Sequence, residues 1–94
     1  MGHFYNFGNI RFTNVEILFA TGDTFNDEQK QEILRRIDEV IAIVDFDNDV
    51  DVVSRETYQQ WQEDGLDPDE PQTFEEYVRA LLEGSWPIAV IFRR

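Results

Sequence analysis

The order of apolar and polar residues along the chain predicts alternating strands and helices. In residues 10–20, apolar side chains alternate with polar ones and the phase changes near Thr13, which predicts a first strand with a bulge. Residues 26–44 then carry apolar side chains at helical spacing. They begin with Asn26 and, three residues on, Gln29, a pair typical of a capping box. We therefore expect the first helix over this range.

The middle of the chain predicts a second strand and a second helix. From residue 45 to 53 acids alternate with other residues, which favours a strand near 49–54. Ser54 is placed to cap a helix over 55–63. Residues 64–71 combine glycine, proline and acids and are expected to form a loop, called the acidic loop below.

The last part of the chain gives the strongest helix signal. Thr73 and Glu76 have the spacing of a capping box, and a full apolar stripe follows, which predicts a helix over 73–84. A continuous apolar run begins after Pro87 and predicts a strand near 87–93, buried on both faces.

Together these elements predict a single α+β domain over residues 1–94. Their order, β-α-β-α-α-β, suggests a three-stranded sheet with about three helices packed on one face. The chain is 41% hydrophobic and contains eight Phe, three Tyr and two Trp, enough for one core. We find no internal repeat, and the acidic loop is the only candidate linker.

Composition excludes several kinds of chemistry. The absence of cysteine excludes disulfides, thiolate metal sites and thiol catalysis. The only histidine, His3, lies at a terminus, and the glycines are too scattered to form a phosphate-binding loop. We therefore expect neither enzymatic activity nor a cofactor. The sequence shows no secretory signal and no apolar run near the roughly 20 residues of a membrane span, so we expect a cytoplasmic protein.

The negative charge is concentrated in one part of the chain. The formal net charge is −12. Residues 45–76, the acidic segment, hold twelve carboxylates and one base, Arg55, and so carry −11. The remaining eight acids and seven bases give −1. Such a surface should repel nucleic acid and anionic membranes and attract a basic partner.

The start of the acidic segment, residues 45–56, resembles the calcium-binding loop of the EF-hand family. Acids occupy loop positions 1, 3, 5 and 12, where the family places oxygen ligands, and the resemblance implies a calcium site there. Position 6, a glycine in the family, is Val50. Because valine rarely adopts a positive φ, we expect no specific metal binding.

A second interpretation of the same acids is electrostatic. On a strand, alternate residues project from one face about 6.6 Å apart, a spacing comparable to that of phosphates along a nucleic acid. The plain alternative is a solvated edge strand whose charges prevent aggregation. Trp61 is expected to pack in the core, or to anchor an interface if it is exposed. The expected partner-binding residues are Asp45, Asp47, Asp49, Asp51, Asp64, Asp67, Asp69, Glu70 and Trp61.

The leading hypothesis is a non-enzymatic inhibitor or regulator that engages a basic, nucleic-acid-binding protein by DNA-like charge mimicry. Phage anti-restriction and anti-CRISPR proteins and nuclease immunity proteins have this size and charge, which is an analogy only. The chief alternative is a salt-adapted domain, because Lys30 is the sole lysine beside seven arginines. A calcium-binding module is the third hypothesis.

Overall fold

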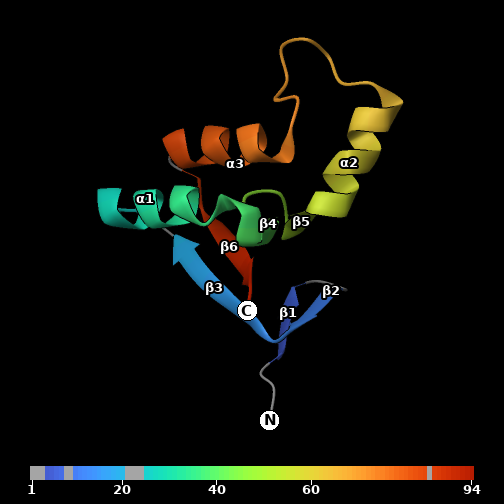
Figure 1. Cartoon of the computed structure of the whole chain (residues 1–94). Coiled ribbons are helices and arrows are strands. Elements are labelled where there is room, and N and C mark those ends of the chain that lie inside the picture. The colour runs from blue at the N-terminus through green and yellow to red at the C-terminus, as the bar shows by residue number, and fades with distance from the viewer. Residues whose placement is uncertain (1–3, 8–9, 21–24, 85) are drawn as a thin grey trace.

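The computed structural model describes residues 4–7, 10–20, 25–84 and 86–94, and within them the α+β class is confirmed (Figure 1). In this part of the chain there are three α-helices and one 3-10 helix, and the strands form two sheets. In chain order the elements are β1 (Phe4–Phe7), β2 (Ile10–Thr13), β3 (Val15–Ala20), α1 (Asp27–Arg35), η1 (Ile37–Glu39), β4 (Val40–Asp45), β5 (Asp51–Ser54), α2 (Arg55–Asp64), α3 (Phe74–Glu83) and β6 (Ile88–Arg93).

The main sheet has four antiparallel strands in the order β3-β6-β4-β5, and β1 pairs with β2 in a separate two-stranded ribbon. The last strand, β6, therefore lies in the middle, between β3 and β4. Its residues Ile88 to Phe92 are at most 1% exposed, which confirms the prediction of a strand buried on both faces.

The helices cover one face of this sheet, as predicted. Figure 1 shows α1 and α3 side by side over the strands, with α2 beside them. Ile33 of α1 and Val78 of α3 share one buried cluster with Val90 and Phe92 of β6. The alternate residues of β6 belong to a second cluster on the opposite face, against which Phe12 packs. The period-two alternation of a strand thus divides the core into two layers.

The prediction of one helix over 26–44 is wrong in its second half. The α-helix ends at Arg35, and β4 begins at Val40 after the short η1. Four of the five residues from Val40 to Val44 are β-branched, and a strand accommodates such side chains better than a helix does. The run pairs with β6 on one side and β5 on the other, and so adds a fourth strand to the three predicted.

The predicted strand over 10–20 is divided into two. Asn14 has a φ of 53°, a left-handed conformation that asparagine tolerates better than most residues. The chain therefore leaves the β1–β2 ribbon there and enters the main sheet at Val15. The expected change of phase is real, but it ends a strand and does not form a bulge within one.

The three helices begin at the predicted cap residues, Asn26, Ser54 and Thr73. Ser54 Oγ accepts from Thr57 N at 3.0 Å. The Asn26 carboxamide accepts from Gln29 N at 2.8 Å and Asn26 N donates to the Gln29 side chain at 3.0 Å, a complete capping box. Thr73 Oγ1 accepts from Glu76 N at 3.1 Å and begins α3. The Glu76 carboxylate, however, accepts from Gln72 N, one residue before the cap.

Arg55, the single base of the acidic segment, is used inside the fold. Its guanidinium donates to Val40 O at 3.0 Å and to Ile37 O at 2.7 Å, and it pairs with Glu75 of α3. The guanidinium carbon also lies 4.8 Å from the centre of the Phe74 ring. This side chain joins η1, β4, α2 and α3, and its charge is held within the structure.

Candidate functional site

The four aspartates expected to form a row lie around a chain reversal. Asp45 ends β4, Asp47 and Asp49 belong to the turn over 46–50, and Asp51 begins β5 opposite Asp45 in the ladder. The prediction that they project from one strand face is wrong, because the chain reverses between them. They form a cluster at one end of the β4–β5 hairpin.

Asp45 has a structural role in this hairpin. It is only 9% exposed, and its carboxylate accepts from Asp47 N at 3.0 Å and from Asn48 Nδ2 at 2.7 Å. These bonds hold the turn in shape, which removes Asp45 from the surface that a partner could touch. Asp47, Asp49 and Asp51 are exposed.

The segment that resembles an EF-hand loop is entered from β4, whereas an EF-hand loop is entered from a helix. The argument from Val50 is also corrected, since Val50 and Asp49 have φ values of 62° and 55°. Among the described residues, no three acidic or histidine side chains are placed to hold a metal ion. The spacing of acids therefore falls on a hairpin turn.

The other predicted acids gather at the end of α2. Asp64 is the last residue of this helix, and Asp67, Asp69 and Glu70 follow it in the acidic loop. All four are exposed. Trp61, one turn earlier in α2, is 39% exposed and so stands at the surface beside them.

The acidic loop, a candidate linker in the sequence, is fixed to the helices on both sides. Gln72 Nε2 donates to the carbonyls of Asp67 and Glu70, at 2.8 Å each. The hydroxyl of Tyr58, a buried residue of α2, donates to Pro71 O. These bonds satisfy backbone groups of the loop and hold it in one conformation.

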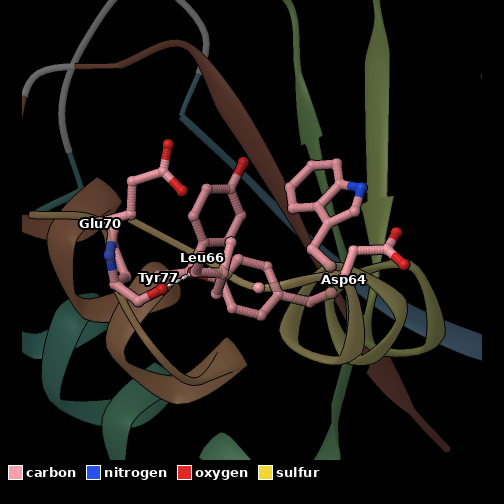
Figure 2. A pocket seen from close by; sticks show the side chains of 8 residues that line it. Asp64, Leu66, Glu70 and Tyr77 are labelled. Carbon is pink, nitrogen blue, oxygen red and sulfur yellow. Dashed lines mark hydrogen bonds between the residues drawn. The ribbon is translucent and has the colours of Figure 1, made fainter. Parts of the chain in front are cut away.

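A cavity of about 490 Å³ lies between α2, the acidic loop and α3 (Figure 2). Figure 2 shows the Asp64 and Glu70 side chains on either side of Tyr77 and Leu66. No base is among the described residues that line it. The lining residues of this aromatic–acidic pocket are Tyr58, Trp61, Asp64, Gly65, Leu66, Glu70, Pro71 and Tyr77.

Three aromatic rings form one side of the pocket. The Tyr58 ring centre lies 5.6 Å from that of Trp61 and 5.2 Å from that of Tyr77. Trp61 and Tyr58 share a face of α2, and Tyr77 comes from the first turn of α3. The sequence analysis singled out Trp61 but not Tyr77, which is one of the residues of the apolar stripe predicted for the helix over 73–84.

The ionisation of the two tyrosines reflects burial and the negative charge around them. Burial, with smaller effects of Asp45 and Asp51, raises the pKa of Tyr77 to about 12. Burial also raises the pKa of Tyr58, and the Glu70 carboxylate adds to the effect. Tyr77 therefore lies within the field of the hairpin aspartates, and Tyr58 lies within that of Glu70.

The exposed acids of the hairpin and the acidic loop have no basic partner in the described part of the chain. The ion pairs found there use other carboxylates, and three arginines supply all of the cations. These arginines are Arg35, Arg36 and Arg55, and their partners are Glu16, Glu32, Glu39 and Glu75.

His3 lies outside the described residues. No helix in the described part of the chain combines the length and apolarity needed to cross a bilayer.

Comparison of the chain with protein-family models, curated proteins and solved structures finds no match.

Proposed function

We propose that this chain is a non-enzymatic binding protein, an inhibitor or regulator that engages a basic, nucleic-acid-binding protein through its acidic surface. The observation that carries the proposal is the set of exposed carboxylates without an ion-pair partner among the described residues. They lie on the β4–β5 hairpin and along the acidic loop, and are Asp47, Asp49, Asp51, Asp64, Asp67, Asp69 and Glu70.

Such a surface has a cost to the fold and an advantage in association. Like charges held close together destabilise the compact state, so a benefit elsewhere is the natural reason for their presence. Attraction over a Debye length of about 8 Å at physiological salt would guide a basic protein toward them and raise the association rate. The support for mimicry of DNA is this charge density, since the straight row of aspartates is absent.

Salt adaptation is the competing explanation. A protein adapted to salt should spread carboxylates over its whole surface, whereas here the unpaired acids of the hairpin and loop belong to one segment. Outside that segment, acids and bases nearly balance, and three of the acids, Glu16, Glu32 and Glu39, are paired with arginines. The distribution favours a surface directed at a partner.

The test uses a triple variant, Asp47→Asn, Asp49→Asn and Asp51→Asn. Proteins captured from the source organism with the wild-type chain would be identified and purified, and their binding measured at 0.05, 0.15 and 0.5 M NaCl. We expect the captured partner to be basic, and the variant to bind it at least about tenfold more weakly at about 0.15 M salt, mainly through slower association.

A matched control removes three charges outside the acidic segment. Glu28, Asp38 and Glu83 are exposed and unpaired among the described residues. Their replacement by Gln, Asn and Gln should change affinity by less than about twofold at about 0.15 M salt, where distant charges are screened. Equal weakening by both triple variants would show a general charge effect and contradict the proposal. A wild-type chain that unfolds below molar salt would favour salt adaptation.

A further inference from the structure

We propose that the aromatic–acidic pocket receives an arginine side chain of the basic partner, with the guanidinium against the aromatic rings and attracted by the Asp64 and Glu70 carboxylates that line the pocket. This inference rests on the proposed function for the source of the arginine. It adds a specific anchor to what would otherwise be diffuse attraction.

The composition of the pocket points to a cation with an apolar stem. Trp61, Tyr58 and Tyr77 supply aromatic rings, whose faces attract positive charge. Leu66 and Pro71 supply apolar surface for a methylene chain. An uncharged apolar side chain could also contact the rings. It would, however, remove water from the Asp64 and Glu70 carboxylates without giving them a hydrogen-bond donor, which is unfavourable.

Among cationic side chains, arginine fits this arrangement better than lysine. Its planar guanidinium stacks on an aromatic ring and has donors on several edges. Asp64 and Glu70 both line the pocket, on either side of Tyr77, so a guanidinium that lies against a ring can donate to one carboxylate and is attracted by the other. A lysine ammonium is compact and strongly hydrated, and it cannot stack in this way.

The pocket is formed before any ligand binds. The bond from Tyr58 to Pro71 O fixes the acidic loop to α2, and the Gln72 side chain donates to the loop carbonyls. Gln72 N in turn donates to the Glu76 carboxylate of α3. A site that is already ordered avoids most of the entropy loss of arranging its walls on binding. Even a small fragment of the partner should therefore bind measurably by itself.

The experiment follows the two indole N–H signals by ¹H–¹⁵N NMR during titration with N-acetyl-arginine amide at constant ionic strength. Trp61 lines the pocket, whereas Trp86, 47% exposed, lies outside it and is an internal control. We expect a saturable shift of the Trp61 signal in the millimolar range, as befits a small fragment, and no shift of Trp86. N-acetyl-citrulline amide, a neutral analogue of the same shape, should leave Trp61 unchanged.

Two double variants locate the site. Asp64→Asn with Glu70→Gln should weaken binding of the arginine amide at least about fivefold, because both rim charges are lost. Asp47→Asn with Asp49→Asn removes the same charge from the hairpin and should change it by less than about twofold. Equal binding of the citrulline analogue, equal weakening by both variants, or a silent Trp61 signal would each overturn the inference.

Binding to the purified partner separates the two proposals. If the arginine amide leaves Trp61 unchanged while the hairpin triple variant still loses the partner, the arginine site is wrong and the proposed function stands. If the amide binds at Trp61 but the captured partner is not basic, the proposed function is wrong and a cation site remains. If both proposals are correct, the variant Asp64→Asn with Glu70→Gln should dissociate faster from the partner. The hairpin triple variant should associate with it more slowly.

Discussion

Replacing Arg55 by methionine is expected to destabilise the domain through lost hydrogen bonds more than through lost charge. Methionine keeps much of the length of the side chain and its contact with Phe74, but it leaves the carbonyls of Val40 and Ile37 without their donor. It also breaks the pair with Glu75 that joins α2 to α3. The substitution therefore tests whether Arg55 organises the elements around it.

The size of the effect follows from these contacts. A hydrogen bond with a charged partner contributes about 1.5–3 kcal/mol. Because the Arg55 side chain is 34% exposed, water replaces part of each bond, and the lower end of that range applies. The half-exposed pair with Glu75 adds only about 0–1 kcal/mol. We expect a loss of about 3–4 kcal/mol, a large share of the roughly 5–14 kcal/mol typical of a domain of this length.

Urea unfolding at pH 7 would measure this loss, with Arg55→Lys as the matched variant. Lysine keeps the charge but cannot reach both carbonyls and Glu75 together, so it should recover no more than about half of the loss. The difference between wild type and Arg55→Met should persist in 1 M NaCl, because its main part comes from bonds to neutral carbonyls. A loss below about 1 kcal/mol, or one that disappears in salt, would refute the reasoning.

Three further predictions concern the hairpin, Tyr77 and calcium. Asp49 has a positive φ, which glycine adopts without strain, and Asp47 does not. In thermal unfolding, Asp49→Gly should therefore be more stable than Asp47→Gly by about 1–2 kcal/mol. Equal stability of the two variants would argue against the left-handed turn. The pKa of Tyr77 is raised to about 12, so the unfolded chain ionises first, near pH 10. The free energy of unfolding should not depend on Tyr77 below that pH, and it should fall by up to about 3 kcal/mol between about pH 10 and 12. Urea unfolding of Tyr77→Phe should show a smaller fall over the same pH range. Calorimetry with Ca²⁺ should find no saturable site tighter than about 10 μM at residues 45–56, and such a site would revive the calcium hypothesis.

The sequence predicted those elements whose pattern allows one interpretation. The stripe of α3 fits a helix only, and the structure begins and ends that helix within one residue of the expected bounds. The run from Val40 to Val44 fits both a helical stripe and a buried strand, and periodicity alone does not separate them. The β-branched residues of this run indicate the strand β4, whereas the predicted helix from Asn26 continues through them to residue 44.

The candidate site was predicted less completely, for a different reason. The exposure of seven acids agrees with the pattern of charge, whereas Trp61, expected to pack in the core, is exposed. The burial of Asp45 depends on a turn whose shape sequence spacing does not specify. The pocket combines Trp61, Glu70 and Tyr77 from two helices and a loop. Only the packing of α2 against α3 and the bond from Tyr58 to Pro71 O bring them together.

The central position of β6 also determines the order in which the sheet can form during synthesis. Strands β3 and β4 are made well before the strand that separates them, and neither can pair with β6 until residues 88–93 have left the ribosome. Until then only the β4–β5 hairpin can pair locally within this sheet, and the apolar faces of β3 and β4 stay exposed. The acidic segment is therefore synthesised before β6. Repulsion between the acidic segments of neighbouring nascent chains on a polysome would keep the exposed faces of β3 and β4 from associating before β6 is made.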